Sequence, residues 1–169
     1  MKLNKSKSYL ATLIMGALLF SGHVVAEKPA IKASEIVIPL PTEENALATK
    51  RVTTRLTQSH YRKFQLDDAF SEKVFNRYLD FLDFSHNIFI QSDIDKMRAD
   101  YANKIDNELN EGKLDIAFAM YDLSMKRRYE RYVYALSLLD KEPNLNDDDQ
   151  IEIKREKAPW PKTEDEANK

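Results

Sequence analysis

The sequence of 169 residues contains no cysteine and only three glycines, at positions 16, 22 and 112. Without cysteine the chain has no disulfide framework, no thiolate zinc site, no thiol nucleophile and no acylated lipoprotein anchor. Phosphate-binding loops, β-bulges and tight hairpins use glycine for positive φ angles, so the scarcity of glycine argues against folds built on them. The near balance of 26 basic and 28 acidic residues gives no overall signature of nucleic-acid binding. We therefore predict an all-α fold.

The amino-terminal residues have the pattern of a secretory signal peptide. Three lysines and no acidic residue precede an apolar run from Tyr9 to Phe20, and small side chains follow up to Ala26. An uncleaved transmembrane anchor needs about 20 apolar residues, and this run is too short. We expect export and cleavage between Ala26 and Glu27, which removes residues 1–26 and leaves a net charge of −5.

Proline and charge patterns divide the exported chain into three parts. Residues 27–41 contain three prolines and predict an extended lead-in, with room for a short strand. Residues 42–142 predict a domain of about four helices. Residues 143–169 predict a linker and the start of a further helix, opened by Thr163 and Glu166 as a capping box. Nucleating a helix costs free energy that only further turns can offset, and few residues follow Glu166. We therefore interpret the sequence as the front of a longer protein.

Capping residues and apolar periodicity define the first two predicted helices. The first begins after Thr42 and carries a rough apolar stripe through His60 and Tyr61 to Phe64. The second begins near Asp67 or Asp68 and ends at about residues 84–87. Apolar residues recur at steps of about four and form one face of this helix. Two further apolar residues make that face wider. The face consists of Leu66, Phe70, Val74, Tyr78 and Phe81 or Leu82, and the widening residues are Phe75 and Leu79.

The third and fourth predicted helices form a hairpin around the last glycine. The third runs from Ser92 through Leu109 and stops at Gly112, a residue suited to the left-handed conformation that ends helices. The fourth is the most regular element and would be a rod about 40 Å long. Its apolar stripe repeats every three or four residues over 26 positions. The stripe residues are Leu114, Phe118, Tyr121, Met125, Tyr129, Tyr132, Leu136 and Leu139.

Two histidines remain after signal-peptide removal, and neither has the neighbours of a strong metal motif. His60 and His86 lie 26 residues apart without a cysteine or a second histidine one turn away. One hypothesis is a metal site that combines them with Asp67 or Asp83. The favoured interpretation makes His60 a hydrogen-bonded histidine at the edge of the core, and His86 a loop residue that binds backbone carbonyls. We predict no metal and no cofactor.

Two charged stretches lack the features that their suggested functions require. The acidic stretch 144–149 would place Asp149 where a calcium-binding EF-hand loop needs glycine, and Arg155 where it needs glutamate. A solvated loop is the favoured interpretation. The basic residues 126–128 and 131 alternate with tyrosines but spread around a helix, so we expect a solvated or partner-facing edge and no nucleic-acid partner.

Serine chemistry has no support in the sequence. Ser71 and Lys73, and likewise Ser124 and Lys126, lie two residues apart and cannot face each other on a helix. The chain contains neither a Gly-x-Ser-x-Gly elbow nor a Ser-x-x-Lys motif. We predict no catalytic residue in this chain, and the substrate-binding residues stay unknown.

Six short stretches of the exported chain together resemble one family. They are RVTTR at 51–55, SHYR at 59–62, LDFLDFSHN at 79–87, GKLD at 112–115, KRRYERY at 126–132 and KAPWPK at 157–162. In this order they resemble the amino-terminal region of the tail-specific proteases, or C-terminal processing peptidases, of Gram-negative bacteria. The resemblance covers the chain from about residue 40 onward.

The resemblance implies an enzyme whose catalytic parts are not in this sequence. The family is periplasmic and joins an amino-terminal helical domain to a PDZ domain, a protease domain with a Ser–Lys dyad, and a further helical region. The PDZ domain captures apolar carboxy-terminal tails of substrates, and the lysine activates the serine. No position here matches those residues, so the resemblance implies that the present chain is inactive.

The resemblance also implies partners: protein substrates with apolar C-termini, a lipoprotein adaptor, the protein's own PDZ and protease domains, and peripheral association with the membrane. Two alternatives stay open. One is a stand-alone periplasmic helical scaffold or adaptor-binding module without enzymatic activity, and the other is a periplasmic metal-binding module.

Overall fold

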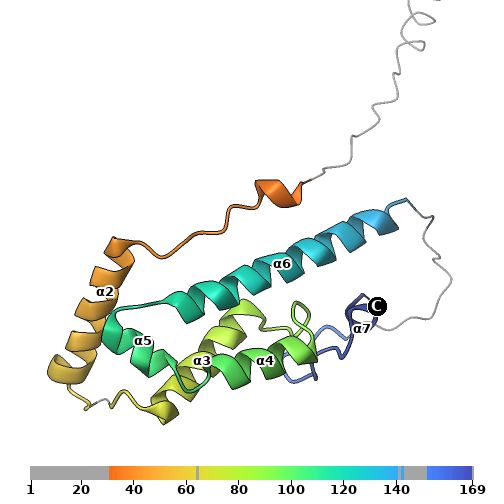
Figure 1. The fold of residues 1–169 in the computed structure, drawn as a ribbon. Coiled ribbons are helices and arrows are strands. Elements are labelled where there is room, and N and C mark those ends of the chain that lie inside the picture. Colours follow the sequence, from red (N-terminus) through yellow and green to blue (C-terminus); the bar gives the residue numbers. More distant parts are fainter. Residues whose placement is uncertain (1–30, 64, 141, 143–151, 169) are drawn as a thin grey trace, which may run out of the picture. The chain divides into compact units, whose positions relative to one another are not determined.

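The computed structural model describes residues 31–63, 65–140, 142 and 152–168, which form helices and loops without a β-strand (Figure 1). The prediction of an all-α fold is confirmed. The predicted signal peptide, its cleavage site at Ala26 and Glu27, and the acidic stretch 144–149 lie outside the described residues. Within the described ranges, no helix combines the length and the apolar character that crossing a membrane requires.

The lead-in and the first helix are only partly as predicted. In its described residues, 31–41, the lead-in forms one 3-10 turn, η1 (Ala33–Glu35). Helix α2 (Glu43–Thr54) starts at the predicted cap, where Thr42 Oγ1 accepts the Asn45 N–H at 3.2 Å. It continues as a π-helical turn, η2 (Arg55–Ser59), and ends before His60, whose backbone is extended. The predicted continuation through Tyr61 is wrong, because α2 buries little apolar surface that could favour a longer helix.

Helix α3 (Asp68–Leu82) begins as predicted, with Asp67 Oδ1 accepting the Phe70 N–H at 2.8 Å. Its buried face is displaced from the predicted one. The completely buried line runs through the two residues that were expected only to widen the face. Of the two alternatives predicted for its end, Leu82 is buried and Phe81 is 80% exposed. The buried residues of α3 are Ser71, Phe75, Leu79 and Leu82.

The predicted third helix is two helices, α4 (Gln91–Tyr101) and α5 (Ile105–Glu111), and the prediction of one continuous helix is wrong. The reason lies in α3. The buried Ser71 hydroxyl accepts the Asp106 N–H at 2.8 Å and donates to the Asp106 carboxylate at 2.7 Å, so it caps the amino end of α5. Gly112 ends α5 with φ of 76°, as predicted.

Helix α6 (Asp115–Leu138) confirms the long fourth helix, but its innermost residues are not the predicted stripe. The buried residues are Ile116, Met120 and Ser124, and most of the predicted stripe lies half-buried beside them. The last helix, α7 (Glu164–Ala167), is capped by Thr163 Oγ1, which accepts the Glu166 N–H at 3.1 Å as predicted.

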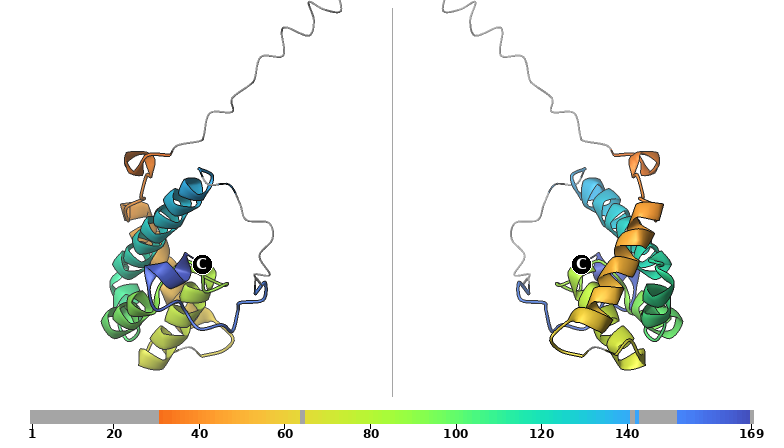
Figure 2. Two further views of the ribbon diagram at one scale, coloured as in Figure 1. Left: turned by 90° about the vertical axis from the view of Figure 1, so that its right-hand side faces the viewer. Right: turned by 90° about the vertical axis from the view of Figure 1, so that its left-hand side faces the viewer.

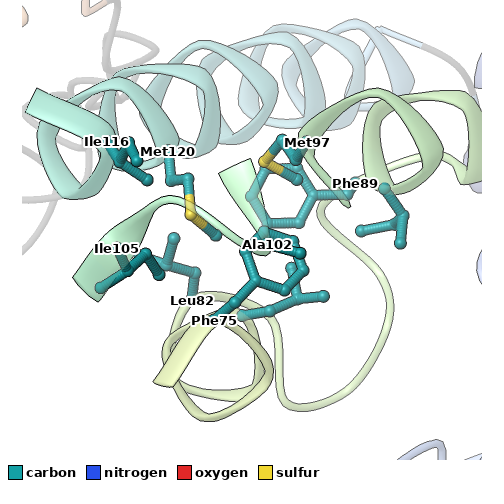
Figure 3. Packing of buried hydrophobic residues seen from close by; sticks show 10 residues of the cluster. Phe75, Leu82, Phe89, Met97, Ala102, Ile105, Ile116 and Met120 are labelled. Carbon is teal, nitrogen blue, oxygen red and sulfur yellow. The ribbon is translucent and has the colours of Figure 1, made fainter. Parts of the chain in front are cut away.

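The core lies where α3, α4, α5 and α6 meet. Helix α3 packs against α5 and α6, and α2 contacts α5 (Figures 1 and 2). Figure 3 shows Ile116 and Met120 of α6 pointing toward Ile105 of α5 and toward the side chains of α3. Phe89, in the loop before α4, has no exposed surface and joins the same cluster. Trp160 packs against this core from the carboxy-terminal segment.

Candidate functional site: the clasp of the carboxy-terminal segment

Asp83, directly after α3, organises the loop that leads into α4. Its carboxylate is 2% exposed and accepts backbone N–H groups from Asn87 at 2.9 Å, Ile88 at 3.1 Å and Phe89 at 3.0 Å. A fourth donor, the indole Nε1–H of Trp160, binds the same carboxylate at 3.1 Å. A carboxylate accepts several hydrogen bonds at once, so one side chain both folds the loop and holds a residue 77 positions further along.

His86 provides the second contact to Trp160. The two rings stack with centroids 3.7 Å apart and planes 20° apart. Nδ1 of His86 lies 2.5 Å from the carbonyl oxygen of Ala158, and a carbonyl only accepts, so Nδ1 carries the proton. The predicted role of His86, binding a backbone carbonyl, is confirmed, although the carbonyl comes from residue 158 and not from the neighbouring helix. The carbonyl of Pro161 accepts the Gln91 N–H at 2.8 Å beside it.

Arg127 of α6 ties the carboxy-terminal segment to α4. Its guanidinium makes a two-bond contact to Asp93, with Nε–Oδ2 at 2.8 Å and Nη2–Oδ1 at 2.9 Å. Its Nη1 binds Glu130 and Glu164, each at 2.8 Å. The hydrogen bond to Asp93 is the main reason that the pKa of Arg127 is raised further above its ordinary value. One side chain therefore connects α4, α6 and α7.

The neighbouring arginines also contact the chain itself. Arg128 donates to the carbonyl of Leu82 at 2.6 Å, and Nη1 of Arg131 donates to the side chain of Asn168. The prediction of a solvated or partner-facing basic edge is wrong for Arg127 and Arg131, whereas Lys126 and Arg128 are exposed as predicted. The reason is periodicity: positions 127 and 131 continue, at steps of three and four, the buried line that ends at Ser124.

We call this set of contacts the clasp: Asp83, His86, Asp93, Arg127 and Arg131 on the body, and residues 158–168 on the segment they hold. Of these residues, only His86 was predicted from the sequence to bind another part of the chain. Trp160, the only tryptophan and flanked by two prolines, is the signal that could have identified the segment as anchored. A rigid stretch with one large aromatic side chain is suited to docking.

The remaining candidates from the sequence do not form a site. His60 is exposed, and its Nδ1 lies 3.2 Å from the backbone nitrogen of Arg62, so the predicted position at the core edge is wrong because the helix ends before it. Ser71 and Ser124 are buried, and the Ser124 hydroxyl donates to the carbonyl of Tyr121 at 2.7 Å. Among the described residues, no three histidine or acidic side chains come together to hold a metal ion.

The geometry thus defines a helical domain whose polar side chains form hydrogen bonds and ion pairs between distant segments of the same chain. The chain belongs to the family described as the tail specific protease N-terminal domain, whose family model matches residues 52–169. It is also 58% identical over 170 residues to the tail-specific protease of Haemophilus influenzae, a match that covers 100% of this chain and 24% of that protein. The resemblance predicted from the six stretches is confirmed, and the chain spans about a quarter of that relative's length.

Proposed function

We propose that this chain is the non-catalytic amino-terminal helical domain of a periplasmic serine endopeptidase that recognises apolar carboxy-terminal tails and processes or degrades proteins. The observation that carries the proposal is the 58% identity, along the whole chain, to a tail-specific protease. The periplasmic location rests on the signal-peptide pattern of residues 1–26.

In this proposal the catalytic serine, its lysine base and the PDZ domain belong to parts of the protein outside this chain. The burial of Ser71 and Ser124 supports this division, because a nucleophile must reach its substrate. The proposed partners are protein substrates with apolar C-termini, a lipoprotein adaptor and the protein's own PDZ and protease domains. We include peripheral membrane association in the proposal.

The clasp supports a positioning role for the domain. It fixes residues 158–168 to the loop between α3 and α4, to the start of α4 and to α6, through an indole, two carbonyls and two arginines. A following domain would then begin from a defined point on a rigid body. The helical domain would thereby set the orientation of the protease machinery relative to its own surface.

The test compares two proteins with one reporter peptide that ends in apolar residues. The intact protein that contains this chain should cleave the reporter, and serine-directed inhibition should abolish the cleavage. Residues 27–169 alone, once circular dichroism has shown them to be helical, should leave the reporter uncut. Serine-dependent cleavage by residues 27–169 would contradict the division of roles. An intact protein that cleaves no tailed substrate would favour the stand-alone scaffold.

A further inference from the structure

The outer side of α3 carries an open groove with an apolar floor, which we call the Tyr78 groove. It has a volume of about 540 Å³ and is lined by Lys73, Val74, Arg77, Tyr78 and Phe81. Phe81 is 80% exposed, and its ring stacks on that of Tyr78 with centroids 6.3 Å apart. Exposed apolar surface of this kind, bordered by charged residues, is typical of a binding surface.

Tyr78 fixes the floor of the groove and connects it to a second groove between α3 and α6. Its hydroxyl donates to the carbonyl of Ala117 at 3.1 Å, which holds the ring in place. Burial, with a smaller contribution from Tyr121, raises the pKa of Tyr78, so the hydroxyl remains a donor at neutral pH. The second groove is lined by Tyr78, Ala117, Tyr121, Phe118 and Pro39.

A segment of this chain borders the far end of the same surface. Ile38, Pro39, Leu40 and Pro41 of the lead-in form one wall of a groove along α6, opposite Phe118. The two prolines hold the residues before them in extended conformations. The surface that begins at Phe81 therefore borders an extended, apolar stretch of polypeptide at its other end. The chemistry of that neighbouring stretch indicates the kind of ligand that suits the open end.

Two cations border the open end. Lys73 and Arg77 lie one helical turn apart on α3 and are both exposed. Neither forms an ion pair with an acidic side chain of the described residues. Glu72, the acidic residue next to Lys73 on α3, pairs instead with Arg98 of α4 at 3.8 Å. Two unpaired cations beside an apolar floor favour a ligand that is apolar and ends in a negative charge.

We propose that the Tyr78 groove binds the apolar carboxy-terminal tail of a protein substrate. The tail's side chains lie on Val74, Tyr78 and Phe81, and its terminal carboxylate lies between Lys73 and Arg77. The volume is within the range of sites for small ligands and short peptides. This inference rests on the proposed function and adds to it a tail-binding surface on the helical domain itself, separate from a PDZ domain.

The experiment places a photoreactive benzoylphenylalanine at position 81 of the intact protein that contains this chain. A labelled peptide ending in four apolar residues is added with a free carboxylate or as the carboxy-terminal amide. We expect cross-linking to the free-carboxylate peptide, and about fivefold less with the amide, the upper effect of one exposed ion pair. Arg77→Glu should reduce the cross-link similarly, whereas Arg55→Glu, at an exposed position of η2, should leave it unchanged.

Cleavage of the same tailed reporter is measured in parallel, so that a failure of the proposed function can be distinguished from a failure of the Tyr78 groove as a tail-binding site. If the intact wild-type protein does not cleave the reporter, the proposed function is overturned. Intact cleavage with no cross-link, or with equal cross-linking of acid and amide, would overturn the Tyr78 groove as a tail-binding site. A cross-link only within the protein's own chain would overturn it as well, because the groove would then be an internal interface. Unchanged melting temperatures of the Arg77 and Arg55 variants serve as the folding control.

Discussion

The region from α3 to α7 and the region formed by the lead-in and α2 are stabilised in different ways. All the buried apolar side chains of the described residues lie between Phe75 and Met120, and the clasp adds buried polar contacts to them. In α2 the buried residue is Thr49, and both Leu47 and Val52 are more than half exposed. The first region buries apolar side chains between distant parts of the chain, whereas α2 contacts α5 without burying an apolar side chain of its own.

The local contacts of α2 explain its shape. Thr42 and Asn45 form a reciprocal cap. Thr54 and Thr57 instead donate to carbonyls four residues back, at 2.8 Å and 2.9 Å. Such bonds compete with the helical pattern and bend helices, and the π-helical turn η2 lies at this point. Good capping therefore starts a helix, whereas apolar burial determines how far the helix continues regularly.

The largest expected effect tests the difference in burial. Phe75→Ala removes a side chain with no exposed surface and should lower the free energy of unfolding by about 3–5 kcal/mol. Val52→Ala on α2 should change it by less than about 0.5 kcal/mol, because the side chain is 57% exposed. Urea unfolding of residues 27–169, followed by circular dichroism, measures both. Equal losses would contradict the division into two regions.

The next effect tests the centre of the clasp. Asp83→Asn replaces one accepting oxygen by a donor that faces other donors, and should cost about 2–3 kcal/mol. Asp80→Asn, three residues earlier on the exposed side of α3, is the matched control and should be close to neutral. Fluorescence of Trp160 reports on the clasp directly and should shift toward longer wavelength in the Asp83 variant. An unchanged spectrum would show that the indole does not depend on this carboxylate.

How well each element could be predicted from the sequence follows the same division. The caps at Thr42, Asp67 and Thr163 and the stop at Gly112 were predictable, because each acts within three or four residues. Strong periodicity also predicted most of α3 and all of α6. Periodicity does not, however, decide which of two adjacent apolar lines faces inward, and for both helices the innermost line was the neighbouring one.

The clasp and the break between α4 and α5 could not be predicted by local rules. Ser71 caps α5 from 35 residues away, and Asp83 binds an indole 77 residues away. In the sequence, Arg127 does not differ from the basic residues around it. Its partners Asp93 and Glu164 are 34 and 37 residues away, and only the packed structure brings them to it. Each of these side chains is polar, and its partner is identified only once the helices have packed.

A smaller effect separates the two arginines of the clasp. Arg127→Met leaves Asp93 largely buried without its two-bond partner and should cost about 1.5 kcal/mol. Arg131→Met, one turn further along α6, should change stability little, because its buried Nε and Nη2 have no acceptor within the described residues. Thermal unfolding of the two variants under identical conditions gives the comparison. A larger loss for Arg131 than for Arg127 would contradict this order.

The smallest effect lies between α5 and α6 and depends on pH. Glu108 of α5 accepts the Ile116 N–H of α6 at 3.0 Å, and burial raises its pKa above the ordinary value of 4.5. A raised carboxyl pKa means that the folded state favours the protonated form. This contribution to stability is complete below the unfolded pKa and is lost as the pH rises through the folded one. Glu108→Gln should therefore be more stable than the wild type at neutral pH, by no more than about 0.5 kcal/mol, and should lose this advantage below pH 4.5.

The pKa of Glu111, one turn further along α5, is shifted in the opposite direction to that of Glu108. The hydrogen bond and ion pair with Lys113 lower its pKa, so its contribution to stability is present above the unfolded pKa and is lost as the pH falls through the folded one. Glu111→Gln should thus be slightly less stable than the wild type at neutral pH and equal to it in acid. Melting temperatures of the three proteins between pH 3 and pH 8 should diverge in opposite directions as the pH rises. Parallel curves would mean that burial against α6 does not distinguish Glu108 from its exposed neighbour.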